Sequence, residues 1–119
     1  MGLEFIFDDN KPIYKQLVEQ LTQKIILGVY PAGSKLPSVR ELALITKVNP
    51  NTVQRALAEL EGKNLVVTKR TSGKFVTENQ KIIKNMHKHI LKEIVDSFLL
   101  DMEKLNISKE EVISYLQEK

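Results

Sequence analysis

Residues 36–62 read LPSVRELALITKVNPNTVQRALAELEG, and this stretch carries the pattern of two short helices joined by a tight turn. Ser38 stands at the position of a helix N-cap, and Glu41 follows at the spacing of a reciprocal capping box. The apolar pattern of this first helix fades shortly before Asn49, which caps a second helix. Pro50 then occupies the first helical position, where a missing N–H has no intrahelical partner to lose. The stretch therefore predicts a helix-turn-helix.

The second helix has one apolar and one polar face. Its apolar residues recur at i, i+3, i+4 and i+7, which predicts a single buried side; they are Val53, Ala56, Leu57 and Leu60. In helix-turn-helix binding, the N-terminal residues of the second helix reach base edges in the major groove. Amide side chains pair with adenine, arginine pairs with guanine, and threonine offers a hydroxyl or a methyl group. We expect Asn51, Thr52 and Gln54 to read sequence, whereas Arg55 fits either reading or positioning.

Residues 65–76, LVVTKRTSGKFV, have a different pattern, in which two β-branched or aromatic runs flank a turn that contains glycine. This pattern predicts a β-hairpin. Basic side chains flank its tip, and a small basic tip enters a minor groove or lies along phosphates. The residues that we assign to positioning on the DNA backbone are Ser38, Arg40, Lys69, Arg70 and Lys74. The alternatives are a solvated hairpin tip and, for Arg40, an ion pair within its helix.

The charge of the chain is unevenly distributed, although its net value is only +3. Residues 35–76 carry eight basic and three acidic side chains, and the rest of the chain is mildly acidic. A basic segment between acidic flanks is typical of a protein that binds a polyanion, although charge alone does not distinguish it from a solvated surface. The sequence has no cysteine, which excludes a disulfide framework and a thiolate zinc site and suits a reducing compartment.

Other functions find little support in the residues. There is no carboxylate pair, serine–histidine set or phosphate loop with a lysine, so we expect neither an enzyme nor a bound cofactor. His87 and His89 would lie about 200° apart on a helix, so we expect no metal site there. No apolar run approaches the ~18 residues of a membrane span, and the N-terminus does not resemble a secretory signal. These features indicate a cytoplasmic protein with no membrane partner.

Helical patterns flank the central region. Pro12 opens a first helix in its first turn, and an apolar stripe follows until Gly28 ends it. Residues 1–9 alternate loosely and predict a short extended arm. The fold class is therefore mainly α with a small β-hairpin. We expect a winged helix-turn-helix domain at residues 1–77 and a two-helix dimerisation segment at residues 78–119.

The C-terminal segment begins with a long helix from about Gln80 to Leu105, and Ser108 with Glu111 opens a short last helix. The apolar face of the long helix is too broad for an isolated helix, so a partner must cover it. A second copy is the simplest partner and gives a two-fold dimer. The expected interface residues are Met86, Ile90, Leu91, Ile94, Val95, Phe98, Leu99 and Met102. A protein-interaction module that keeps the fold without reading DNA is the alternative function.

The elements LPSVREL, NPNTV and the G-x-F-V end of the hairpin resemble the DNA-binding domain of the GntR family of bacterial transcription regulators. The resemblance covers residues 11–77 and implies a winged helix-turn-helix repressor that binds operator DNA as a dimer. The DNA-contacting positions of the family correspond here to Ser38, Arg40, Asn49, Asn51, Thr52, Gln54, Arg55, Gly73 and Lys74.

Two positions depart from the family pattern. Asn64 stands where family members usually have glycine, and asparagine is the next most tolerant residue for a left-handed conformation, so we expect the turn to survive. Thr71 replaces the first of two glycines in the hairpin tip.

About forty residues follow the hairpin, too few to enclose a typical metabolite pocket. In this respect the chain resembles the short YtrA-like branch of the family, whose members often control transporter operons. The sequence does not identify a small-molecule effector.

Overall fold

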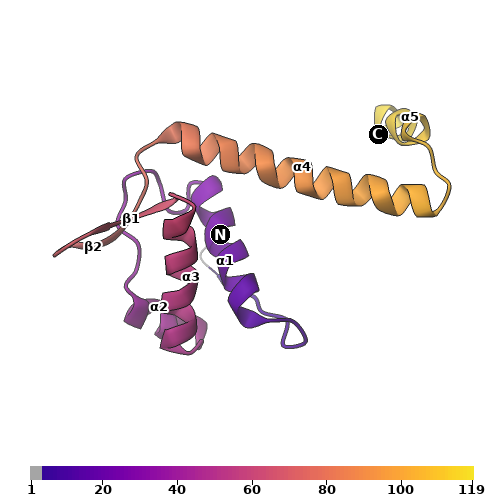
Figure 1. Cartoon of the computed structure of the whole chain (residues 1–119). Helices are drawn as coiled ribbons and strands as arrows, with labels where there is room; N and C mark the ends of the chain where they lie inside the picture. Colours follow the sequence, from indigo (N-terminus) through magenta and orange to yellow (C-terminus); the bar gives the residue numbers. More distant parts are fainter. Residues whose placement is uncertain (1–3) are drawn as a thin grey trace. The chain divides into compact units, whose positions relative to one another are not determined.

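The computed structural model describes residues 4–119, in which five helices flank one β-hairpin (Figure 1). The elements in chain order are α1 (Ile13–Ile26), α2 (Val39–Thr46), α3 (Pro50–Gly62), β1 (Val66–Lys69), β2 (Gly73–Val76), α4 (Gln80–Lys104) and α5 (Lys109–Glu118). The expected class, mainly α with a small hairpin, is confirmed. The chain forms two compact units, one ending at Lys84 and the other running from Asn85 to Lys119.

The core of the first unit lies where α3 packs against α1, α2 and β1, and Figure 1 shows α1 and α3 side by side. The predicted apolar stripes of α1 and α3 both point into this core. The largest fully buried side chains are Leu17, Leu21, Leu42, Leu57, Leu60 and Leu65 together with Val53, Val66 and Val76. Burying one such side chain stabilises the fold by about 1.5–3 kcal/mol, so this cluster holds α3 in place.

The boundary between α2 and α3 follows the predicted caps. The Ser38 hydroxyl accepts a hydrogen bond from the Glu41 N–H at 3.1 Å, and the Glu41 carboxylate accepts one from the Ser38 N–H at 3.0 Å. The Asn49 side chain caps α3, whose first residue is Pro50. Lys47 turns the chain with a left-handed φ of 59°. A turn of three residues, 47–49, therefore links the two helices, and the apparent proline break is a helix start.

The start of α1 differs from the prediction by one residue. Pro12 is the N-cap with a ψ of 122°, so the helix begins at Ile13. The predicted arm partly lies outside the described residues, which begin at residue 4. Its described part is held along α1 by two glutamines, because Gln16 hydrogen bonds both backbone groups of Asp8 and Gln20 both backbone groups of Ile6. None of the residues 4–11 forms a strand.

The end of α3 confirms the expectation for Asn64. This residue has a φ of 64°, and its N–H donates to the Glu61 carbonyl at 3.0 Å. The next N–H, that of Leu65, donates to the Leu60 carbonyl at 3.0 Å. This pair of bonds is a Schellman motif, which satisfies the last carbonyls of a helix and normally uses glycine at the left-handed position. Asparagine therefore closes α3 and directs the chain into β1.

The hairpin is the wing of the fold. β1 and β2 pair antiparallel, with Val66 opposite Val76 and Lys69 opposite Gly73. Residues 33–36 add a further edge to β2: the Leu36 N–H donates to the Lys74 carbonyl at 2.9 Å, and the Val76 N–H donates to the Ser34 carbonyl at 2.9 Å. The segment before α2 thus lies against the wing, which ties the wing to the start of the helix-turn-helix.

Candidate nucleic-acid interface

The N-terminal half of α3 presents polar side chains on the side opposite the core. Asn51 and Gln54 are exposed and Thr52 is partly exposed, whereas Val53 and Ala56 have no exposed surface. The predicted division of this helix into a buried and a polar face is therefore confirmed. Three hydrogen-bonding side chains share the first two turns of a helix whose N-terminus also favours phosphate. This geometry matches a helix that enters a major groove.

Two of the predicted contact residues also hold the helix ends. Ser38 and Asn49 both accept cap hydrogen bonds with their side-chain oxygens, at 3.1 Å and 2.8 Å respectively. The Ser38 hydroxyl hydrogen and the Asn49 amide group stay chemically able to donate to a phosphate. Arg40 lies in the first turn of α2 and is exposed. Backbone and side-chain hydrogen bonds with Ser38 lower the pKa of Glu41 and thereby keep the cap ionised.

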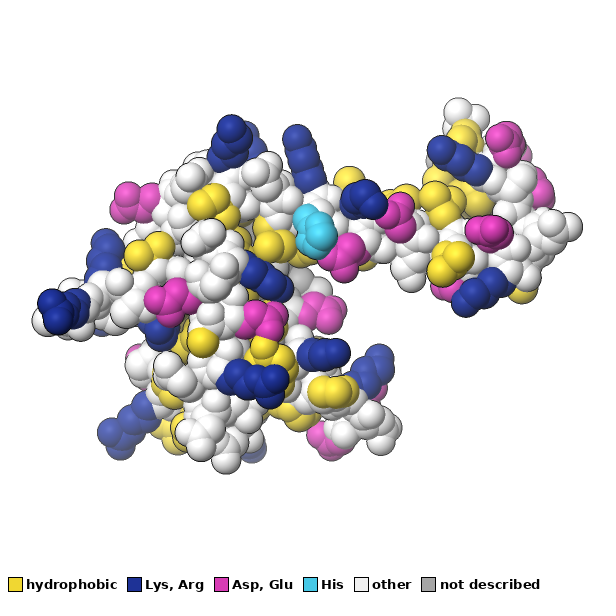
Figure 2. All heavy atoms as spheres, in the orientation of Figure 1, with side chains coloured by type: hydrophobic (Ala, Val, Ile, Leu, Met, Phe, Trp, Pro, Cys, Tyr) yellow, Lys and Arg dark blue, Asp and Glu magenta, His cyan; other side chains and the backbone are white. Residues whose placement is uncertain are grey.

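The wing carries basic side chains at its free end, which Figure 2 shows in dark blue on the left of the view. Lys69 and Arg70 are exposed there, and the Lys69 ammonium lies 4.4 Å from the centre of the Phe75 ring. A cation over an aromatic face keeps its charge, so both groups can meet a phosphate. Gly73, the first residue of β2 after the turn, has a φ of 108°, a conformation that favours glycine.

Lys74 does not share this exposure, although the sequence assigned it to DNA. Its ammonium lies 3.2 Å from the Glu61 carboxylate and 2.9 Å from the Thr68 hydroxyl, and only 19% of its side chain is exposed. The Glu61 carboxylate also accepts a hydrogen bond from Thr68 at 2.7 Å. These bonds lower the pKa of Glu61. Lys74 thus joins the end of α3 to both strands of the wing.

Lys35 is a basic residue of this surface that the sequence prediction did not include among its contacts. It is exposed and pairs with Phe75 in an isolated bridge beside β2. Its side chain crosses Gly73 so closely that a Cβ added there would lie 3.2 Å from the Lys35 Cε. The position of Lys35 in the basic segment was a usable signal, but its pairing with the wing is not visible in a local pattern.

Arg55 lies against α1. Its guanidinium carbon is 3.9 Å from the centre of the Tyr14 ring. The Tyr14 hydroxyl donates a hydrogen bond to the Glu59 carboxylate, which pairs with the Lys63 ammonium at 3.2 Å. The hydrogen bond from Tyr14 lowers the pKa of Glu59, with help from the charges of Lys63 and Arg55, and raises the pKa of Tyr14. One flank of α3 is therefore joined to α1 by polar contacts.

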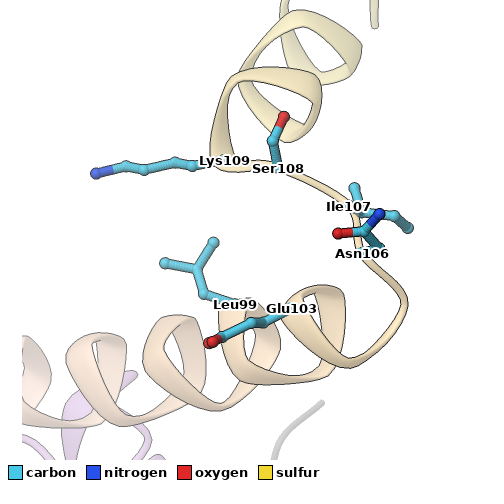
Figure 3. Close-up of a pocket in the computed structure, with 6 residues that line it drawn as sticks. All are labelled: Leu99, Glu103, Asn106, Ile107, Ser108 and Lys109. Carbon is cyan, nitrogen blue, oxygen red and sulfur yellow. The ribbon is translucent and has the colours of Figure 1, made fainter.

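The second unit leaves its apolar residues uncovered. Neither α4 nor α5 contains a buried residue, and the exposed fractions reach 57% for Leu91, 63% for Ile94 and 43% for Phe98. A hollow of about 370 Å³ lies between α4 and the start of α5 (Figure 3). Leu99 lines this hollow and also belongs to the predicted interface.

His89 pairs with Glu93, and residues 4–119 contain no cluster of three metal-ligating side chains.

This combination of a buried helix-turn-helix core, an exposed polar helix start and a basic wing defines a winged helix-turn-helix DNA-binding protein. The family model for bacterial regulatory proteins of the gntR family matches residues 13–76, and the chain belongs to this family. It is a DNA-binding transcription regulator and not an enzyme. No helix within residues 4–119 is both long and apolar enough to span a bilayer.

Two relatives from Bacillus subtilis are similar over most of their length. The HTH-type transcriptional regulator YhcF is 38% identical over 107 residues, which cover 90% of this chain and 88% of YhcF. The HTH-type transcriptional repressor YtrA is 35% identical over 110 residues, covering 92% of this chain and 85% of YtrA. Among solved structures, a GntR family transcriptional regulator from Listeria monocytogenes is 45% identical with a TM-score of 0.89, covering 95% of this chain and 99% of that one.

Proposed function

We propose that this protein is a cytoplasmic, dimeric repressor that recognises a specific operator through the N-terminal half of α3. The observation that carries this proposal is the arrangement of that helix. Asn51 and Gln54 are exposed in its first turns while the opposite face is completely buried. Amide side chains at this place form paired hydrogen bonds with adenine N6 and N7, which is a base-specific contact. Thr52 adds a hydroxyl and a methyl group beside them.

The remaining polar residues would position the helix on the duplex. Arg40, Lys69 and Arg70 are exposed cations on α2 and the wing, and Lys35 lies next to the wing tip. Such groups neutralise phosphates without reading sequence. Ser38 and Asn49 hold the helix starts and offer donors to the backbone. Lys74 is occupied by Glu61 and Thr68 at 3.2 Å and 2.9 Å, so we assign it to holding the wing.

Dimerisation would use the apolar face of α4, with residues 1–77 as the DNA-binding domain and 78–119 as the dimerisation segment. Four of the eight predicted interface residues are exposed by at least 40%, and the other four are half-buried. An uncovered apolar face of this kind on a small regulator favours a partner surface. A two-fold dimer would place two copies of α3 over half-sites about one or two helical turns apart.

Repression is supported by the similarity to the repressor YtrA. The resemblance to the YtrA-like branch further points to a transporter operon as the regulated target. A strain that lacks the gene should then transcribe that operon more strongly, and supplying the protein should restore low transcription. Lower transcription in the deletion strain would instead identify an activator.

The base-reading assignment is tested with a duplex selected from a random pool. Replacing both Asn51 and Gln54 with alanine should abolish the preference for the selected operator over a scrambled duplex, while binding to both duplexes at low salt persists. A double variant that keeps the same preference and affinity would refute the assignment. If the parent protein binds duplexes only at low salt and prefers none at physiological salt, the exposed face of α4 is the working surface of a protein-interaction module.

A further inference from the structure

The polar contacts between Arg55 and α1 form a small network on one flank of α3. The Arg55 guanidinium carbon lies 3.9 Å from the centre of the Tyr14 ring, and the hydroxyl of the same tyrosine is hydrogen bonded to Glu59. Arg55 and Glu59 are four residues apart on α3, and Lys63 follows four residues later at the C-cap, so the three share one side of the helix. Tyr14 lies in the first turn of α1. The ring face and the hydroxyl of Tyr14 are therefore both held by the same flank of α3.

This network differs in kind from the other contacts of α3. Val53, Ala56, Leu57 and Leu60 are completely buried, but apolar contacts are not directional and tolerate small rotations of a helix. A hydrogen bond and a guanidinium stacked over a ring each require a particular geometry. Rotation of α3 about its axis would break both contacts to Tyr14. A site that must match a rigid ligand needs such supporting contacts to stay within about 0.5 Å of the productive geometry.

We propose that Arg55 is a positioning residue that acts through Tyr14 to fix the rotation of the recognition helix, and that it does not contact DNA. The inference rests on the proposed function, because it concerns how α3 presents Asn51 and Gln54 to bases. It replaces the sequence-based assignment of Arg55 to the DNA-contacting set. Arg55 is exposed, as Arg40 and Arg70 are, but those two arginines have no stacking partner in residues 4–119. The Tyr14 ring under Arg55 belongs to α1 and is also bonded to Glu59, whereas the Phe75 ring under Lys69 belongs to the wing itself.

The test compares Arg55→Ala, Tyr14→Leu and the double variant, with Arg70→Ala as the matched control that removes an exposed arginine. Tyr14→Leu keeps an apolar side chain but removes the ring face and the hydroxyl. Operator and scrambled duplexes are titrated across a salt series, and each affinity is corrected for the fraction of active, folded protein. We expect either single variant to bind the operator about two- to fivefold more weakly. The double variant should be no weaker than the single ones, and the scrambled duplex should be bound as by the parent.

The salt dependence separates this role from a phosphate contact. Each phosphate contact contributes about 0.9 to the slope of log affinity against log salt, so Arg55→Ala should leave the slope unchanged, whereas Arg70→Ala should reduce it. A reduced slope for Arg55→Ala, or parental operator affinity for Tyr14→Leu, would overturn the proposal. Lower stability with unchanged operator affinity of the folded protein would also overturn it, since the role would then be purely structural. If the parent protein selects no operator at all, the proposed function itself fails.

Discussion

The contrast between Arg70 and Lys74 gives a sharp prediction about the wing. Both are basic, both flank the hairpin turn, and the sequence assigned both to the DNA backbone. In the structure Arg70 is exposed at the tip, whereas Lys74 lies 3.2 Å from the Glu61 carboxylate with only 19% of its side chain exposed. Replacing Arg70 with alanine should therefore remove a phosphate contact. Replacing Lys74 with alanine should instead loosen the attachment of the wing to α3.

The expected magnitude follows from the two-fold symmetry of the proposed dimer. Because each of the two protomers carries Arg70, the alanine variant neutralises two fewer phosphates, which lowers the slope of log affinity against log salt by about 1.8. Between about 50 and 200 mM salt, the parent should therefore lose roughly tenfold more affinity than Arg70→Ala does. Lys74→Ala should keep the parental slope. Because the pair with Glu61 is partly exposed, its removal should lower the free energy of unfolding by about 1 kcal/mol or less.

The assay is a titration of a labelled operator duplex at several salt concentrations, combined with urea unfolding of the same preparations. Lys69→Ala is a useful companion, since it removes a second exposed cation from the same strand end. Equal slopes for Arg70→Ala and the parent would refute the reasoning, as would a lowered slope for Lys74→Ala. A slope reduced by only about 0.9 for Arg70→Ala would indicate that a single protomer contacts the duplex.

Three further predictions concern assembly and stability. Ile94→Glu should weaken the dimer at least about thirtyfold, because the 63% of this side chain that is exposed would otherwise be buried in both protomers; sedimentation that shows an unchanged dimer would contradict the interface. Asn64→Ala should lower the free energy of unfolding by about 1 kcal/mol because of its left-handed φ of 64°, whereas Asn64→Gly should not; equal urea midpoints for the two variants would contradict this. The folded-state pKa of Glu61 lies below its unfolded value of 4.5. The ionised carboxylate therefore adds to the free energy of unfolding above pH 4.5, and this contribution is lost as the pH falls through the folded pKa. Glu61→Gln should therefore lose less stability than the parent between about pH 6 and pH 3 in urea unfolding, and an equal loss would contradict the assignment.

The local patterns of the sequence predicted the elements well. The capping pair Ser38–Glu41 and the cap at Asn49 involve residues within three positions of one another, so their geometry depends only on local spacing. The same holds for Asn64, whose left-handed conformation is set by the end of α3. The helix at Pro12 was placed one residue too early, because a proline satisfies the N-cap position as readily as the first turn.

The roles of individual basic residues were harder to predict, since they depend on contacts between distant segments. Lys74 meets Glu61 across 13 positions, and Arg55 meets Tyr14 across the interface of two helices. Lys35 reaches the wing only because residues 33–36 pair with β2. Each pairing depends on how the helices and strands pack together. The periodic spacing of apolar residues predicts which face of a helix is buried, but it does not predict which partner each charged side chain contacts.

Selection of bound sequences from a random duplex pool tests the central claim most directly, because it measures DNA binding, base preference and half-site spacing together. The parent protein should enrich an inverted repeat whose half-sites lie about one or two helical turns apart. The Asn51→Ala, Gln54→Ala double variant should enrich no repeat under the same conditions. Enrichment of no sequence by the parent, or of the same repeat by the double variant, would contradict the account.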